Sequence, residues 1–197
     1  RDVNAPMLHH AIQAAGGKPH LYGIVNDDLS AIQAPVQKAM DECEIVLLSG
    51  STSMDSRDVA AAIIDDLGTV LVHGVAVKPG KPTIVGTIRE KPIFGLPGNP
   101  VSVYFTFYLF VRPLLQSYLG AQVVERNTRL PLASTVITNH GREEYLPVLV
   151  RDGLAHPITW KSNLITRVSG ADGFICIPRE QNKIEQGELV KVTFLDA

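Results

Sequence analysis

The sequence lacks most of the features that assign a protein at first sight. Its 197 residues include only 2 cysteines, Cys43 and Cys176, with no CxxC spacing, which excludes a disulfide framework and a cysteine-rich zinc site. The 6 histidines show no HExxH or other paired ligand spacing. No Walker A loop, GxGxxG loop or GxSxG elbow is present. Phosphate-loop, dinucleotide and α/β-hydrolase chemistry therefore lack their signatures.

An excess of one charge and a long apolar run are also missing. Lys plus Arg number 18 and Asp plus Glu number 20, a formal net charge of -2, so we expect neither nucleic acid nor a membrane as partner. The most apolar stretch, Val101–Leu119, is interrupted by Arg112 and Pro113 and falls short of the roughly 20 residues of a membrane span. The opening residues do not resemble a secretory signal. We expect a cytoplasmic protein and, because the chain opens at Arg1, the C-terminal part of a longer one.

Hydrophobic residues make up 45% of the chain, enough for a sizeable core. Their periodicity alternates between helix and strand in the first two-thirds. We predict helices near residues 8–15, 29–40, 58–67 and 100–118, and strands at Leu21–Val25, Glu44–Leu48, Val70–Val77, Thr83–Val85 and Ile93–Leu96. This order predicts an α/β domain over residues 1–120, with a mostly parallel sheet covered by helices on both faces.

Short strands separated by Gly, Asn and Pro follow Gly120. The predicted strands are Leu132–Ile137, Tyr145–Arg151, Leu154–Trp160, Gly173–Ile177 and Leu189–Phe194, with a hairpin turn at Arg151-Asp152-Gly153. They predict a small, barrel-like all-β domain over residues 121–197.

Three loops at strand ends carry the residues that suit chemistry: 49–58, 78–82 and 95–100. Ligands bind at the carboxyl ends of the strands in parallel sheets, so we expect these loops to converge. In the second loop, two prolines stiffen the turn that holds Lys78 and Lys81. Two fixed ammonium groups suit a phosphate or another oxyanion; the alternative is a solvated surface turn.

The other two loops also suit an anion. Gly98 permits close approach of a ligand to the backbone, Asn99 is an expected N-cap, and Ser102 adds a hydroxyl on the first helical turn. The alternative is a tight strand-to-helix turn with nothing bound. In the loop 49–58, small hydroxyl residues can form an anion-binding nest. Asp55 and Asp58 suit a metal ion or proton transfer; the alternative is that Asp58 or Ser56 only caps the next helix.

Two motifs together resemble the MoeA family, the molybdopterin molybdenumtransferases, which include the E domain of gephyrin. They are the segment Val-Lys-Pro-Gly-Lys-Pro at residues 77–82 and Gly-Leu-Pro-Gly-Asn-Pro-Val-Ser at residues 95–102. Three further stretches also resemble segments of the family: Arg1–Asn4, Gly141–Tyr145 and Ser162–Asp172. The resemblance implies a three-layer MogA-like domain followed by the family's C-terminal β domain.

The resemblance also implies a reaction. The family inserts molybdate into adenylylated molybdopterin with release of AMP, as a homodimer and assisted by a divalent cation, which we expect to be Mg²⁺. Carried over by position, the implied catalytic residues are Asp58, Lys78 and Lys81, and Asp58 is also the implied metal ligand. The implied ligands of molybdate and phosphate are Lys78, Lys81, Pro82, Ser102, Arg142 and Ser162. The implied loop for the pterin and its phosphate comprises Ser49, Gly50, Ser53, Gly98 and Asn99.

Three alternatives stay open from the sequence. The family's Ser-Gly-Gly-Val-Ser is Ser49-Gly50-Ser51-Thr52-Ser53 here, so the oxyanion is either molybdate or tungstate. A MogA-type molybdopterin adenylyltransferase shares the α/β domain but lacks the β domain that carries Arg142 and Ser162. A non-catalytic dimerisation or scaffold module is the third possibility.

Overall fold

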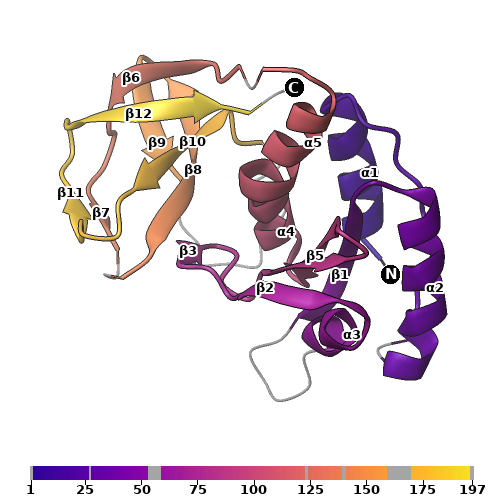
Figure 1. The fold of residues 1–197 in the computed structure, drawn as a ribbon. Coiled ribbons are helices and arrows are strands. Elements are labelled where there is room, and N and C mark those ends of the chain that lie inside the picture. The colour runs from indigo at the N-terminus through magenta and orange to yellow at the C-terminus, as the bar shows by residue number, and fades with distance from the viewer. Residues whose placement is uncertain are drawn as a thin grey trace. The chain divides into compact units, whose positions relative to one another are not determined.

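Figure 1 shows the computed structural model of the chain, which describes residues 2–26, 28–52, 59–122, 124–138, 141–158 and 170–195. The chain forms two compact units. The first comprises Arg1–Val75 and Gly80–Gln122, and the second comprises Ala76–Pro79 and Val123–Ala197. The backbone therefore passes from one unit to the other three times.

The first unit holds one sheet and all the helices that the described residues form. Its elements are α1 (Asn4–Ala14), α2 (Leu29–Glu42), β1 (Val46–Thr52), α3 (Val59–Leu67), β2 (Thr69–His73), β4 (Ile84–Ile88), β5 (Lys91–Pro97), α4 (Pro100–Thr106), the π-helix η1 (Phe107–Val111) and α5 (Arg112–Tyr118). The α/β fold class predicted for this part is confirmed.

The direction of the strands differs from the prediction of a mostly parallel sheet. The strand order is β1-β5-β4-β2, and only β1 and β5 run parallel, whereas β4 pairs antiparallel with both β5 and β2. A tight turn at Arg89 and Glu90, with φ of 51° and 64°, joins β4 to β5. Two successive residues with positive φ are typical of a two-residue hairpin, which makes neighbouring strands antiparallel.

Two predicted strands also differ. The segment Leu21–Val25 is not a strand, because Gly23 has a φ of 83° that breaks the extended backbone, and Ile24 is 80% exposed. The predicted strand Val70–Val77 is divided at Gly74, which has a φ of 87°. Its first part is β2, while Val77 belongs to β3 in the second unit.

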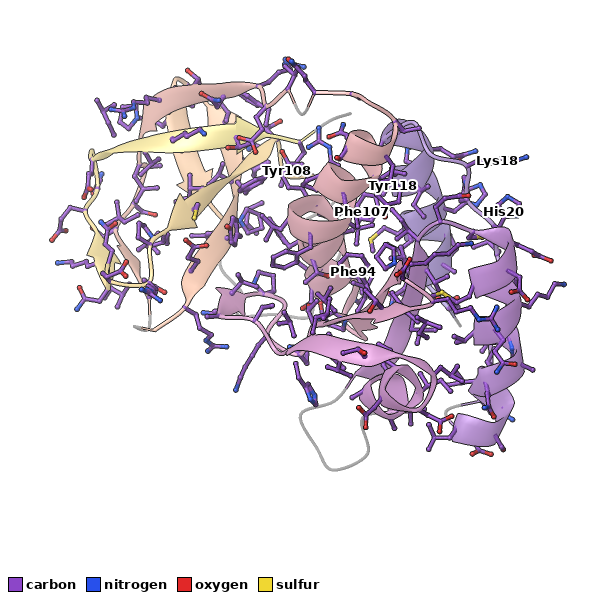
Figure 2. The ribbon with its side chains drawn as sticks, viewed as in Figure 1. Lys18, His20, Phe94, Phe107, Tyr108 and Tyr118 are labelled. Atoms are coloured by element: carbon purple, nitrogen blue, oxygen red, sulfur yellow. The ribbon has the colours of Figure 1, made fainter. Side chains whose placement is uncertain are left out.

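Apolar side chains cover both faces of the first sheet. One face packs on α2 and α3 through a cluster that includes Met40, Ile64 and Ile93. The other face packs on α1, α4 and η1, and Phe94 from β5 and Phe107 from η1 (Figure 2) both belong to that cluster. Ile93 and Phe94, which are successive residues of β5, thus point to opposite faces, as the strand geometry requires.

The helix ends follow local rules that the sequence predicts. The Asp28 carboxylate accepts a hydrogen bond from the Ser30 amide at the start of α2, and Asn99 caps α4 in the same way. The π-helix η1 interrupts the long predicted helix just before Pro113. Proline has no N–H to donate to the carbonyl four residues earlier, so this turn widens.

The second unit consists of strands. They are β3 (Val77–Lys78), β6 (Asn127–Pro131), β7 (Val136–Ile137), β8 (Glu143–Arg151), β9 (Leu154–Pro157), β10 (Gly173–Ile177), β11 (Lys183–Ile184) and β12 (Leu189–Phe194). The larger sheet has the order β3-β8-β10-β12-β6, with β9 also paired to β8, and β11 pairs with β7. An all-β second domain is confirmed.

The barrel-like shape predicted for this unit is only partly formed. Among the described residues no closed barrel exists, because the edge beyond β6 meets β9 through a single bridge, between Leu132 and Ala155. Closure requires a continuous ladder of backbone hydrogen bonds, and β9 has only four residues. Inside the curled sheet lie buried residues such as Leu146 and Ile175. No helix in the described part of the chain has the length and apolarity to cross a membrane.

Candidate functional site

The strand register of the first unit brings three loops to one edge of its sheet. Leu48 of β1 is paired with Gly95 of β5, Gly95 with Ile84 of β4, and Ile84 with His73 of β2. Because β4 alone runs in the opposite direction, β1, β2 and β5 all end at this edge and β4 begins there. The described residues of the first unit that adjoin these strand ends therefore share it, although the sheet is not mostly parallel.

The start of α1 is tied to this edge. The side-chain amide of Asn4 donates a hydrogen bond of 3.1 Å to the carbonyl of Gly98, across 94 positions of sequence. Asn4 is only 7% exposed, and its carbonyl oxygen has no hydrogen-bond partner among the described residues. An unsatisfied buried acceptor is costly, so this oxygen is suited to accept from a ligand.

Gly50 and Gly98 leave the backbone at this edge of the sheet uncovered by side chains of their own. A Cβ added to Gly98 would stand 3.6 Å from the Cα of Gly50, so the backbones of the two loops lie side by side. Gly50 itself has a φ of 93°, which side chains rarely adopt. Ser49 and Gly50 are both exposed. Backbone groups at this edge are thus accessible to a bound molecule.

The first turn of α4 completes the edge. The Asn99 side chain accepts from the amides of Val101 at 3.0 Å and Ser102 at 3.3 Å. The Ser102 carbonyl in turn accepts from the Thr106 hydroxyl. Ser102 is half-buried, and these bonds fix the backbone that carries its own hydroxyl.

Lys81 and Pro82 lie at the same edge, in the turn that leads into β4. The Lys81 carbonyl accepts from the Val75 amide at 2.9 Å, and the buried Thr83 hydroxyl donates to the Gly80 carbonyl at 2.7 Å. These bonds hold the backbone of the turn while the Lys81 side chain stays exposed. A cation held in this way is suited to an anionic ligand.

Lys78 lies in the second unit, where it is paired with an acid. Its ammonium is 2.9 Å from a carboxylate oxygen of Glu144, a residue that is only 5% exposed. The Thr138 hydroxyl donates to the other oxygen of Glu144. A buried charge is tolerated only when it is paired and hydrogen-bonded, and Glu144 meets both conditions. Lys78 is therefore an ion-paired cation and not an isolated point charge.

The remaining predicted residues are placed as follows. Arg142 is half-buried and lies in the second unit, directly before β8. Ser53, Asp58 and Ser162 lie outside the described residues. In the described part of the chain no group of three or more His, Cys, Asp or Glu side chains could hold a metal ion.

Two residues of the site were not predicted as ligands from the sequence. Asn4 stands in the matched opening segment, but its long-range bond to Gly98 depends on how α1 packs, which no local pattern encodes. Glu144 carried a usable signal. It shares the parity of Leu146 and Val148 along β8, both buried, so strand periodicity places this acid on the core side of the sheet.

Comparison with known proteins assigns both units. Residues 1–117 match the model of a probable molybdopterin binding domain, and residues 129–195 match the MoeA C-terminal region (domain IV). The chain belongs to the MoeA family. It is 31% identical over 206 residues to a molybdopterin molybdenumtransferase of Bacillus subtilis, covering 99% of this chain and 47% of that protein.

Further relatives of the MoeA family agree with this. A gephyrin of Dictyostelium discoideum is 27% identical over 234 residues, covering 99% of this chain and 33% of its own length. The crystal structure of a MoeA protein from Pyrococcus horikoshii superposes with a TM-score of 0.88 at 38% identity, covering 100% of this chain and 48% of the other. The chain thus spans about half the length or less of these relatives.

Proposed function

We propose that the protein is a molybdopterin molybdenumtransferase. It takes adenylylated molybdopterin and molybdate, cleaves the adenylate with release of AMP, and inserts the metal into the dithiolene of the pterin. Membership of the MoeA family supports this assignment. So does the β unit that matches the MoeA C-terminal region, which a MogA-type adenylyltransferase lacks.

The observation that carries the proposal is the register that gathers three loops at one edge of the first sheet. There we propose that Ser49, Gly50, Ser53, Gly98 and Asn99 bind the pterin and its phosphate through backbone and small polar groups. The buried side-chain oxygen of Asn4, which has no hydrogen-bond partner among the described residues, adds an acceptor for a ligand N–H. A phosphate is well served by backbone N–H groups at a loop followed by a helix.

Molybdate is a tetrahedral dianion and needs several fixed donors. We propose, from the positions that match the family, that Lys78, Lys81, Pro82, Ser102, Arg142 and Ser162 supply them. Only two residues separate Lys78 from Lys81, so the backbone keeps their Cα atoms within about 11 Å of each other. Lys78 and Lys81 also stabilise negative charge that develops as the phosphoanhydride is cleaved.

Three further elements belong to the proposal. Asp58 is the residue that we expect to bind Mg²⁺, which when bound would offset charge on the phosphoanhydride. A homodimer is the expected assembly and the cytoplasm the expected location. Tungstate is the alternative oxyanion.

The test uses the complete protein with adenylylated molybdopterin, molybdate and Mg²⁺. Release of AMP that depends on molybdate is expected, and Lys81→Ala should reduce its rate at least ten-fold while Lys38→Ala, on the exposed face of α2, leaves it unchanged. No AMP release from the folded wild-type protein would overturn the proposal. Adenylylation of molybdopterin by ATP would instead point to the adenylyltransferase.

A further inference from the structure

We propose that Glu144 is a positioning residue that holds the ammonium of Lys78 in place for the oxyanion. This inference rests on the proposed function, since it concerns a residue that we assign to the molybdate site. Glu144 is not among the residues that the sequence pointed to. Its role is inferred here from its burial and its contacts.

The backbone sets Lys78 opposite Glu144. Strand β3 has only two residues and pairs in parallel with the start of β8, where Lys78 is the register partner of Glu144. The amide of Glu143 donates to the Ala76 carbonyl at 2.9 Å just before this pair. The two side chains then meet at 2.9 Å. Both backbone and side chains therefore fasten the same short segment to β8.

The carboxylate of Glu144 is itself held on its far side. The hydroxyl of Thr138 donates to Oε2, while Oε1 faces the Lys78 ammonium. Thr138 and Glu144 are 8% and 5% exposed. A buried carboxylate with both oxygens engaged has little freedom to turn, so the position of Oε1 is well defined.

The Lys78 side chain, by contrast, is long and has access to solvent. Its exposed fraction is 34%, and a lysine side chain loses conformational entropy when it is fixed. The ion pair with Glu144 fixes it before any ligand arrives. An ammonium has three protons, so one directed to Glu144 leaves two for the oxygens of an anion.

A rival effect has the opposite sign. The negative charge of Glu144 also repels a dianion that approaches Lys78. If this repulsion were its main effect, neutralising Glu144 would tighten the binding of molybdate. If Glu144 acts by positioning, neutralising it loosens Lys78 and weakens binding. The sign of the change therefore separates the two.

The experiment measures molybdate-dependent AMP release by the complete protein. Glu144→Gln is expected to raise KM for molybdate about ten-fold with kcat changed less than two-fold, and Thr138→Val should raise KM by a smaller factor. Glu185→Gln is the matched control, because Glu185 pairs with Lys183 on the surface of the same unit. That variant should behave as the wild type.

A double variant tests whether Glu144 acts through Lys78. In the Lys78→Gln background, adding Glu144→Gln should leave KM unchanged, because there is no ammonium left to position. Independent, multiplied effects of the two changes would indicate a merely structural role and overturn the inference, as would a lower or unaltered KM in Glu144→Gln. Should Glu144→Gln fail to fold, Thr138→Val decides by the same criterion. An inactive wild-type protein would instead refute the proposed function.

Discussion

At the scale of single residues, Gly86 is required by the packing of the fold, whereas Gly98 lies at the candidate site. An added Cβ at Gly86 would lie 2.4 Å from Ile64 and 2.7 Å from the Thr69 carbonyl, whereas at Gly98 the nearest atom is 3.6 Å away. We expect Gly86→Ala to lower the free energy of unfolding by about 1–3 kcal/mol. Gly98→Ala should leave it within about 0.5 kcal/mol.

The same pair of variants tests the binding edge. The methyl of Gly98→Ala would stand between the loops that we assign to the pterin, so we expect at least a ten-fold loss of affinity for adenylylated molybdopterin in equilibrium dialysis. Urea unfolding supplies the stability measurement. Wild-type affinity in a folded Gly98→Ala variant would exclude this loop from the binding site.

Tyr145 on β8 gives a prediction for pH. Burial, followed by the neighbouring Cys176 and Glu143, raises the pKa of Tyr145, and burial likewise raises the pKa of the Cys176 thiol. Above pH of about 10 an unfolded tyrosine loses its proton while the folded one retains it. The folded state then binds more protons than the unfolded state. The contribution of Tyr145 to the free energy of unfolding is therefore fully present below about pH 10 and is lost as the pH rises further.

The measurement is urea unfolding at pH 8 and at a series of values up to pH 11. Tyr145→Phe should make the alkaline loss of stability smaller than in the wild type. A control is Tyr118→Phe, since Tyr118 is 53% exposed at the end of α5. An equal alkaline slope in Tyr145→Phe and the wild type would contradict the prediction.

At the scale of elements, Lys91 of β5 caps the C-terminal end of α2. The ammonium of Lys91 donates to the carbonyls of Met40 at 2.7 Å and Cys43 at 3.0 Å, at the C-terminal end of α2. These carbonyls have no further partner within the helix, and a cation also suits that end of its dipole. We expect Lys91→Met to destabilise the protein by about 1–2 kcal/mol.

The comparison is with Lys38→Met in the same helix. Lys38 is 65% exposed and stands 4.0 Å from Glu42, so its loss should cost less than about 0.5 kcal/mol. Thermal unfolding followed by circular dichroism at 222 nm reports both. Equal changes in the two variants would show that the contacts of Lys91 do not support α2.

The elements that the sequence predicts well are those governed by local chemistry. Asn99 with Pro100 marks the start of α4, and Asp152 with Gly153, with φ of 52° and 72°, forms the predicted hairpin turn. Strand direction was not predictable in this way. The antiparallel β4 depends on the turn at Arg89 and Glu90, neither of which is a residue that favours positive φ.

The candidate site likewise has a part that could be predicted from the sequence and a part that could not. The three loops were predicted to converge because strand ends collect ligands, and the register places the parts described in the first unit, residues 49–52, 80–82 and 95–100, at one edge. Their convergence survives the wrong prediction of strand direction, because β2 and β5 run the same way on either side of β4. The partnership of Lys78 with Glu144 joins residues 66 positions apart and could not be read from a pattern.

For the whole molecule, the decisive feature is that residues 76–79 leave the first unit and return. A cut after Gln122 would leave β3 on one fragment and β8 on the other. We expect the amide of Glu143, which donates to the Ala76 carbonyl, to exchange its hydrogen at least ten-fold faster in the separate fragment 123–197 than in the intact chain.

Hydrogen exchange followed by mass spectrometry or NMR measures this difference. The amide of Ile175 serves as the internal reference, because its strand β10 pairs only with strands of the same fragment. Equal protection of Glu143 in fragment and chain would mean that β3 contributes nothing to the order of β8. Faster exchange at both amides would mean that the whole fragment is unfolded.

The detour of β3 also bears on how such a protein can be rearranged by recombination. A breakpoint placed at the linker near residue 122 looks harmless, yet it would transplant a sheet without its first strand and without the counter-ion of Glu144. That buried acid would then lose the ammonium with which it pairs in the intact chain, and breaking a buried ion pair is costly. Exchange of the β unit between genes is therefore expected to succeed only when the Lys-Pro-Gly-Lys turn is inherited with it.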